Sequence, residues 1–157
     1  MQIDSRLLRS ALGTFATGVI VVSAAYEGQE HAMTANSFTS VSLTPPLVLI
    51  CTHNNARMTR VLERGMEFGL SVLAADQENI SRRFAGRAEG PAVDFSWVRG
   101  VPLIAAAAAH FVCRLVDSRV AGDHTVQIGE VEHFQSCSRA PLVFWNGLYA
   151  ALAEKPP

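Results

Sequence analysis

The sequence has few charged residues and few cysteines, and both shortages exclude whole classes of protein. Only 17% of the 157 residues are charged and 49% are apolar, which excludes an intrinsically disordered chain. The net charge is −1 and no stretch concentrates basic residues, which argues against a nucleic-acid-binding surface. The cysteines lack the close spacing of a disulfide framework and predict a reducing, cytoplasmic environment; they are Cys51, Cys113 and Cys137.

Long apolar runs are also missing. The longest, residues 101–113, is interrupted by Pro102 and His110 and is shorter than the roughly 20 residues that a membrane span needs. The first residues do not have the layout of a signal peptide, which agrees with the expected cytoplasmic location. No linker or repeat divides the chain, so residues 1–157 are expected to form a single domain.

The short motifs that mark common catalytic sites are absent. There is no G-x-G-x-x-G, G-x-x-x-x-G-K-[ST], G-x-S-x-G or H-E-x-x-H. None of the five histidines has a partner at the spacing of a structural zinc site, so no metal site is predicted. If the protein is an enzyme, we expect a bound cofactor to carry the chemistry.

The sequence contains a series of short strands and few helices. A first helix capped by Asp4 or Ser5 is predicted to end at Gly13, with Leu7, Leu8 and Leu12 on its apolar face. Further helices are predicted over 57–64 and from a cap at Asp76 through Phe84. Strands are predicted over 18–25, 47–51 and 67–73 and in much of 95–149, with turns at 117–118, 122–124 and 146–147. Because β-α-β alternation is absent, this order predicts an antiparallel barrel or sandwich.

Three stretches have chemical potential, and the first is the polar segment 33–46. Small hydroxyl and amide side chains there let another molecule approach the backbone closely. Exposed N–H and C=O groups can then match the polar edge of a flat heterocycle. A polar sheet face followed by a turn explains the same composition, so the residues alone leave both interpretations open.

The second stretch is 53–60, where an apolar strand is followed by an Asn-rich turn and the start of a helix. Free N–H groups and the helix dipole make this turn a candidate anion site, with Asn55 as a cap and Thr59 and the arginines as donors. The dipole contributes only ~0.3–1 kcal/mol, up to ~2. Micromolar binding needs ~8 kcal/mol, so the rest of a ligand must supply most of the affinity. An ordinary capped helix is the alternative interpretation.

The third stretch is Gly122-Asp123-His124, a turn that exposes a histidine. The ordinary pKa of histidine, ~6.5, lets it act as a hydrogen-bond donor in either protonation state. A surface histidine without a function has the same local sequence.

Taken together, the chain resembles the small flavin reductases that serve two-component flavin-dependent monooxygenases. The resemblance is carried by residues 15–19, 33–42, 45–48, 83–85, 122–124 and 141–144, in the expected order. It implies a mainly β fold, an FMN-binding split β-barrel of antiparallel, Greek-key type with a few short helices, assembled as a homodimer. It also implies hydride transfer from NADH or NADPH to FMN or FAD, and release of the reduced flavin to a partner monooxygenase.

The resemblance also implies roles for individual residues. His124 is expected to lie near the nicotinamide as the catalytic residue. The expected cofactor-binding residues are Thr34, Ala35, Asn36 and Ser37 along the flavin ring; Ser40, Val41 and Ser42 at the ring edge and ribityl chain; Cys51 at the end of a strand; His53, Asn54, Asn55, Ala56, Arg57 and Thr59 around the phosphate; and Phe84 against the nicotinamide or an adenine. Ala56 departs from the family pattern, which often has Ser or Thr there, and so lacks one hydroxyl donor.

Three other interpretations are compatible with the residues. A flavin-binding protein of the same fold can act as a store or sensor without turnover. The barrel can instead bind haem, with His31 or His53 as an axial ligand. A purely structural dimeric module is the third alternative, and the polar segment argues against it.

Overall fold

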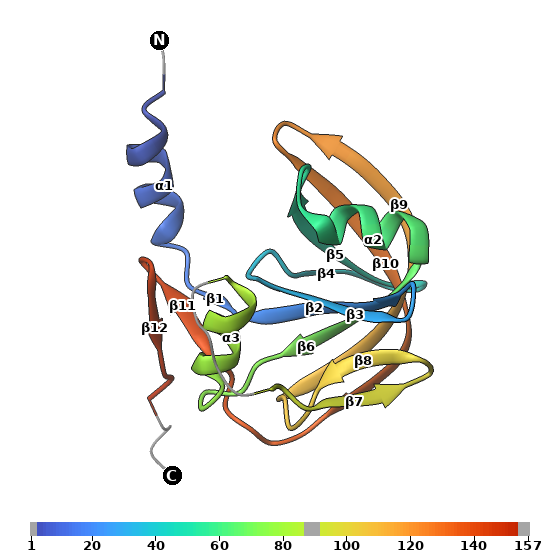
Figure 1. Cartoon of the computed structure of the whole chain (residues 1–157). Helices are drawn as coiled ribbons and strands as arrows, with labels where there is room; N and C mark the ends of the chain where they lie inside the picture. Colours follow the sequence, from blue (N-terminus) through green and yellow to red (C-terminus); the bar gives the residue numbers. More distant parts are fainter. Residues whose placement is uncertain (1–2, 87–91, 154–157) are drawn as a thin grey trace.

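The computed structural model describes residues 3–86 and 92–153, and its centre is one antiparallel sheet of seven strands (Figure 1). The strands lie across the sheet in the order β3-β2-β6-β9-β10-β5-β4. Their bounds are β2 Ile20–Tyr26, β3 Gln29–Ala35, β4 Thr39–Leu43, β5 Pro46–His53, β6 Glu67–Val72, β9 Ala109–Ala121 and β10 His124–Ser136. This confirms the prediction of an antiparallel, mainly β fold.

Smaller elements surround this sheet. One three-stranded sheet consists of β1 (Thr17–Gly18), β11 (Val143–Trp145) and β12 (Leu148–Ala150), and one hairpin consists of β7 (Phe95–Val98) and β8 (Val101–Ile104). The helices in the described residues are α1 (Ser5–Gly13), α2 (Arg57–Gly65) and α3 (Glu78–Phe84). None of them is long and apolar enough to cross a membrane.

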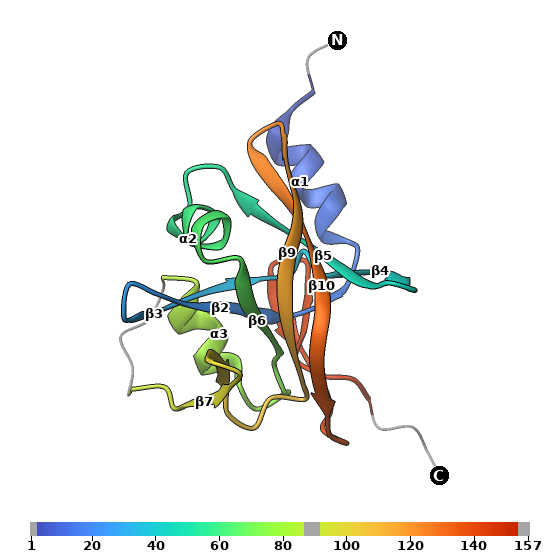
Figure 2. The same ribbon diagram turned by 90° about the vertical axis from the view of Figure 1, so that its right-hand side faces the viewer.

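The seven-stranded sheet is curled, and the connection between its edge strands shows why. β3 and β4 lie at opposite edges of the sheet, yet only residues 36–38 separate them in the chain. A chain from Ala35 to Thr39 spans at most roughly 14 Å. The two edges must therefore come close together, and the segment 36–38 crosses the seam between them, as in Figures 1 and 2.

The core lies on both faces of β2. Ile20, Val22 and Ala24 point into the cluster inside the curl, where α2 packs with Met58 and Leu62. Val21, and Val19 just before the strand, belong to a second cluster on the outer face, which α3 and the β11–β12 hairpin cover. Because successive side chains of a strand point to opposite faces, a strand buried on both sides is a continuous apolar run. This is the buried strand that the sequence predicts over 18–25.

Strands β9 and β10 form a long hairpin that corrects one sequence prediction. Asp117 and Ser118 were expected to form a turn, but they lie inside β9, paired with Ile128 and Gln127 of β10. The register shifts beside them, between Ile128 and Gly129, and the ladder continues on both sides of this irregularity. The predicted turn at 146–147 is confirmed as a hairpin connection. The one at 122–124 is confirmed at residues 122–123, and His124 is already the first residue of β10.

The first helix follows its sequence signals, while the third does not. Asp4 caps α1 by accepting hydrogen bonds from the N–H groups of Arg6 and Leu7, as predicted. The predicted cap of α3 at Asp76 is wrong, because the helix begins two residues later and its cap position is Gln77. Asp76 lies in the preceding turn and pairs instead with Arg139, at 2.5 Å. This long-range ion pair has no signal in the local sequence.

Candidate functional site

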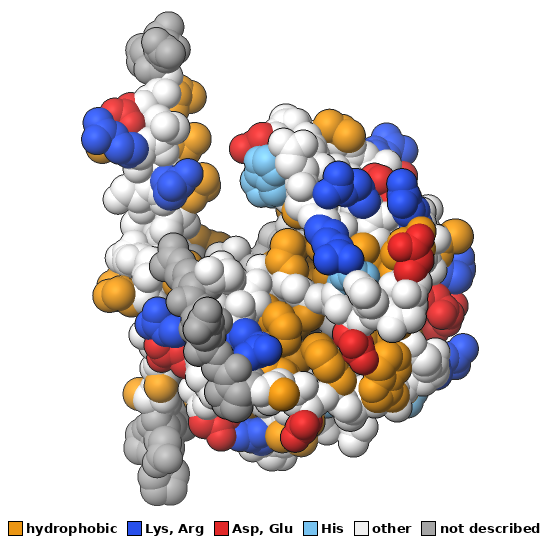
Figure 3. Space-filling model, in the orientation of Figure 1, with side chains coloured by type: hydrophobic (Ala, Val, Ile, Leu, Met, Phe, Trp, Pro, Cys, Tyr) orange, Lys and Arg blue, Asp and Glu red, His pale blue; other side chains and the backbone are white. Residues whose placement is uncertain are grey.

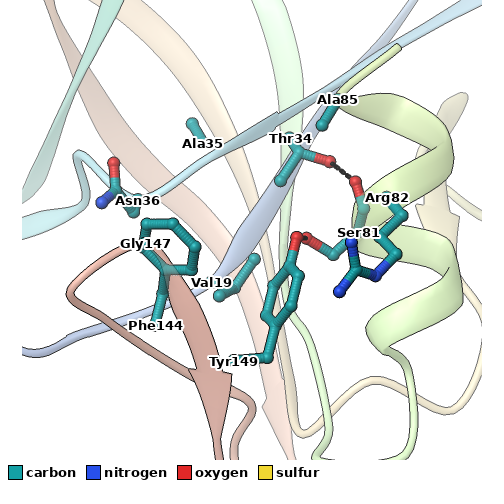
Figure 4. A pocket seen from close by; sticks show the side chains of 10 residues that line it. All are labelled: Val19, Thr34, Ala35, Asn36, Ser81, Arg82, Ala85, Phe144, Gly147 and Tyr149. Carbon is teal, nitrogen blue, oxygen red and sulfur yellow. Dashed lines mark hydrogen bonds between the residues drawn. The ribbon is translucent and has the colours of Figure 1, made fainter. Parts of the chain in front are cut away.

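Residues 34–37 form the wall between two cavities at the seam of the sheet. One cavity, of about 310 Å³, lies against Cys51, His53 and His124, and we call it the histidine cavity. The other, of about 340 Å³, lies against Tyr149 and α3, and we call it the tyrosine cavity (Figure 4). Thr34, Ala35 and Asn36 line both, so the two cavities share one stretch of backbone.

Two hydroxyl groups hold this stretch in place. Thr34 Oγ1 donates to the carbonyl of Ser81 in α3, at 2.7 Å (Figure 4). Ser37 Oγ donates to the carbonyl of Cys51 and accepts from its N–H, at 2.9 and 3.0 Å. Both hydroxyls use their single donor hydrogen within the protein, so they position the backbone of this stretch. In the described part of the chain the N–H groups of Asn36 and Ser37 have no hydrogen-bond partner, which leaves them available as donors.

Cys51 lines the histidine cavity, but its thiol is not a reactive group. Both backbone polar groups of Cys51 are bonded to Ser37, and burial raises the pKa of its thiol. A thiol with a raised pKa remains protonated near neutral pH and is a poor nucleophile. The geometry therefore agrees with the packing role expected for this residue.

A pair of histidines closes the far end of the histidine cavity. The register of β10 on β5 places His124 opposite His53, and the two rings meet edge to face with centroids 5.4 Å apart. Asp123 Oδ1 lies 2.7 Å from His124 Nδ1. This hydrogen bond holds the pKa of the Asp123 carboxyl below its usual value. Asp123 is thus a carboxylate that accepts from Nδ1–H, and Nε2 is left as the functional nitrogen of His124.

The turn 53–56 is bound to the β9–β10 hairpin through Asn54. Its Nδ2 donates to the carbonyl of Gly122 at 3.0 Å, its Oδ1 accepts from Thr125 Oγ1 at 2.8 Å, and its N–H donates to the carbonyl of Asp123. Residues 53–54 and 122–125 are therefore one rigid unit. Any ligand that touches the turn is fixed relative to His124 as well.

The start of α2 differs from the expectation for this turn. The prediction of Asn55 as the cap is wrong: the cap position is Ala56, which makes no side-chain hydrogen bond. The N–H of Asn55 donates to His53 Nδ1 instead, at 3.1 Å. With no side chain accepting from the first turn, its N–H groups are free to bind an anion. The absence of a hydroxyl at Ala56 thus leaves the backbone donors open.

Thr59 connects the turn to buried residues of the sheet. It is buried, its Oγ1 donates to the carbonyl of His53 at 2.8 Å, and it lies 2.7 Å from Thr52 Oγ1. Thr52 in turn shares hydrogen bonds with Gln127, which is fully buried. The Thr59 hydroxyl therefore joins α2 to β5 and β10 and is not a free donor.

Some predicted site residues lie away from the two cavities. Ser40, Val41 and Ser42 belong to the edge strand β4 and line neither cavity. Phe84 packs into the outer core cluster, with its ring centroid 6.1 Å from that of Phe95. Arg57 extends towards Gln29, 3.4 Å from its Oε1. The roles expected for these residues stay predictions.

Sequence reasoning missed the aromatic side of the tyrosine cavity. Phe144 and Tyr149 form it, and their rings meet edge to face with centroids 5.4 Å apart (Figure 4). Tyr149 OH lies 2.7 Å from Ser81 Oγ, and the Arg82 guanidinium lies 5.0 Å from the Tyr149 ring centroid. Phe144 belonged to a stretch that carried the family resemblance, but no local pattern indicated Tyr149 or α3 as its neighbours.

Comparison with known proteins supports one family throughout. The sequence model of the flavin reductase like domain matches residues 12–153. An NADH-dependent flavin reductase of Rhodococcus sp. is 49% identical over 150 residues, which cover 92% of this chain and 85% of that protein. The NADH:FAD oxidoreductase SgcE6 of Streptomyces globisporus C-1027, solved with NAD and FAD fragments, has a TM-score of 0.90 at 40% identity, covering 98% of this chain and 97% of that chain. The styrene monooxygenase flavin reductase of Pseudomonas putida S12 has a TM-score of 0.89 at 36% identity, covering 96% and 99%.

Proposed function

This chain belongs to the flavin reductase like domain family, and we propose that it is an NADH-dependent flavin reductase that supplies reduced flavin to a monooxygenase. The family assignment also confirms the FMN-binding split β-barrel as the fold class. The observation that carries the function is the shared wall 34–37, which presents free backbone donors between two cavities and ends at the paired histidines.

The residues along this wall fit a flavin. A flat ring needs a surface without bulky side chains, and Thr34, Ala35 and Asn36 provide one. The N–H groups of Asn36 and Ser37 are donors of the kind that carbonyl and ring-nitrogen acceptors at the polar edge of a flavin need. Donors directed at this edge also stabilise the negative charge that develops when the ring is reduced.

The turn 53–57 fits the phosphate of FMN or FAD. Ala56 leaves the first N–H groups of α2 uncapped, and Asn55 and Arg57 are exposed beside them. The turn is rigid through Asn54, so a phosphate bound there fixes the distance from the rest of the flavin to His124. Ala56 thus contributes to phosphate binding by leaving the backbone N–H groups of the first turn of α2 uncapped.

The bound flavin accepts a hydride from the nicotinamide, and the protein contributes positioning. Catalysis by orientation would require the two rings to be held face to face, and the lining residues of the two cavities would hold them. Asp123 keeps the proton of neutral His124 on Nδ1. Nε2 then accepts a hydrogen bond from a carboxamide N–H, and it becomes a donor only in the imidazolium form. His124 therefore orients the nicotinamide and exchanges no proton in the hydride step.

A homodimer is the assembly that we propose for the enzyme. Helix α1 has no buried residue, and Leu7, Leu12 and Phe15 are 71%, 66% and 78% exposed. Figure 3 shows apolar side chains on the side of α1 that faces the gap between this helix and the rest of the molecule. An amphipathic helix with its apolar side in solvent needs a partner, and a second copy provides one. The cytoplasmic location stays a prediction.

The rate of NADH oxidation distinguishes a flavin reductase from a flavin store or sensor. Purified protein is mixed with NADH, and the loss of NADH absorbance is followed before and after addition of FMN or FAD. A flavin reductase oxidises NADH rapidly only when flavin is present. A protein that binds flavin without accelerating NADH oxidation is a store or sensor. A Soret band in the spectrum of the purified protein instead indicates haem.

A further inference from the structure

A third cavity lies on the flank of α2, outside the two cavities of the proposed flavin site. It has a volume of about 200 Å³ and lies between α2 and the β2–β3 hairpin. We call it the arginine pocket because Arg57, Arg60 and Arg64 line it from the helix, opposite Tyr26 and His31 of the hairpin. Basic side chains gather over α2 in the space-filling view (Figure 3). Residues one and two helical turns apart lie on one side of a helix, so the three guanidinium groups form a row.

The charge of this row is not neutralised within the protein. Among the described residues, none of the three arginines has a carboxylate within ion-pair distance, although Glu27 also lines the pocket. Several arginines elsewhere do have such a partner, for example Arg82 with Glu78 and Arg114 with Glu130. Three like charges on one side of a helix repel one another. A bound anion removes this repulsion.

His31 adds a hydrogen-bonding group to the side of the pocket opposite the arginines. Its side chain lines the arginine pocket and is only 8% exposed. Its ring nitrogens are not among the fully buried unpaired atoms of the described residues, so they keep contact with solvent. An acceptor bound in the pocket replaces that solvent and accepts from the ring N–H. A phosphate oxygen is such an acceptor, and arginine is the side chain best suited to bind it.

The arginine pocket adjoins the proposed flavin site. His31 and Met33 lie on the same face of β3, and Met33 lines the histidine cavity. Arg57 is the first residue of α2, where we place the flavin phosphate, and Arg60 follows one turn later. A ligand that continues beyond that phosphate reaches the pocket next. FMN ends at one phosphate, whereas FAD continues through a second phosphate to adenosine.

We propose that the arginine pocket binds the second phosphate of FAD, the one that carries the adenosine, and makes the protein prefer FAD over FMN. The inference rests on the proposed flavin reductase function and adds the identity of the flavin. Arg60, Arg64 and His31 are the residues that discriminate between the two flavins. Arg57 belongs to the phosphate turn and contacts either one.

Flavin titrations test the proposal. Dissociation constants for FAD and FMN are measured by flavin fluorescence on the wild type and on Arg60→Gln/Arg64→Gln, which preserves helix propensity. The wild type is expected to bind FAD about tenfold more tightly than FMN, and the double variant to lose about this factor for FAD alone. Arg119→Gln, an exposed arginine on β9, is the matched control and leaves the preference unchanged. AMP is expected to compete with FAD in the wild type and to have little effect on FMN.

Other results overturn the proposal. Equal affinity of the wild type for FAD and FMN, with normal NADH turnover, removes the FAD preference and leaves the flavin reductase function intact. A double variant whose FAD affinity is unchanged but whose KM for NADPH rises shows that the pocket receives the nicotinamide dinucleotide. Failure of the wild type to bind or turn over either flavin overturns both this inference and the proposed function.

Discussion

At the scale of single residues, the contact between Asp123 and His124 determines which hydrogen bonds the histidine can make. The carboxylate occupies Nδ1 at 2.7 Å, so only Nε2 can serve a substrate. Because the pKa of Asp123 is held below its usual value, this contact persists as the pH falls and is lost only when the pH passes that lowered pKa. The orientation of His124 is therefore stable across the neutral range.

His124→Ala is expected to slow the reduction of bound flavin by NADH up to about a hundredfold, because the nicotinamide loses an orienting hydrogen bond. Flavin affinity is expected to change little, since His124 lies at the end of the histidine cavity. Anaerobic stopped-flow mixing measures the rate, with His133→Ala, an exposed histidine on the same strand, as the control. A wild-type rate in His124→Ala rejects the role.

Gly129 has to be glycine because its neighbours in the core leave no room for a side chain. A Cβ atom at this position of β10 would lie 2.6 Å from Phe68 Cζ and 3.0 Å from Cys113 Cβ. Gly129→Ala is therefore expected to lower the free energy of unfolding by about 1–3 kcal/mol in urea denaturation. Gly18→Ala is the control, because nothing lies within 4 Å of its Cβ position, and its effect stays below about 0.5 kcal/mol. Equal losses in both variants contradict this packing argument.

At the scale of elements, the uncapped start of α2 is the part of the site with the clearest ligand chemistry. Asn55→Ala combined with Arg57→Ala is expected to weaken FMN binding about tenfold and riboflavin binding much less, because riboflavin has no phosphate. Fluorescence titration of each ligand gives the two ratios. If both ligands lose affinity equally, the phosphate is bound elsewhere in the protein.

Local sequence patterns predicted those elements that are determined by residues within the element itself. The buried run in β2, the cap of α1 at Asp4 and the helix over 57–64 all follow from nearby residues. The continuation of β9 through Asp117 could not be read from the sequence, because pairing with β10 overrides a local turn preference.

The candidate site was predictable to a similar extent. The segment 34–37 and the turn at His124 are short, polar and distinctive, so they were found as separate pieces. Their meeting in the histidine cavity depends on the register of β10 on β5, which nothing in either piece specifies. Tyr149 was missed because its contact with Ser81 joins residues far apart in the chain.

At the scale of the whole molecule, the exposed apolar side of α1 supports the dimer that we propose. Leu7→Glu combined with Leu12→Glu places charges on this side and is expected to yield a monomer in light scattering, because a buried unpaired charge is costly. Arg6→Gln, whose side chain is 92% exposed, is the control on the same helix and leaves the dimer intact. A dimer that survives both glutamates shows that α1 is not in the interface.

The position of the wall 34–37 depends on the fold of the whole molecule. It bridges the two edges of the curled sheet, and it is fixed by α3 on one side and by β5 on the other. A ring bound against it lies between α3 and the β11–β12 hairpin on one side and β5 and His124 on the other. Its position is thus set by the fold and not by one flexible loop.

A crystal structure of the protein soaked with FMN measures this central claim most directly. The account predicts ring density along the backbone of 34–37, with the phosphate at the start of α2 and His124 at the end of the cavity. Flavin density at another place, or none while the protein's own side chains fill the two cavities, contradicts it.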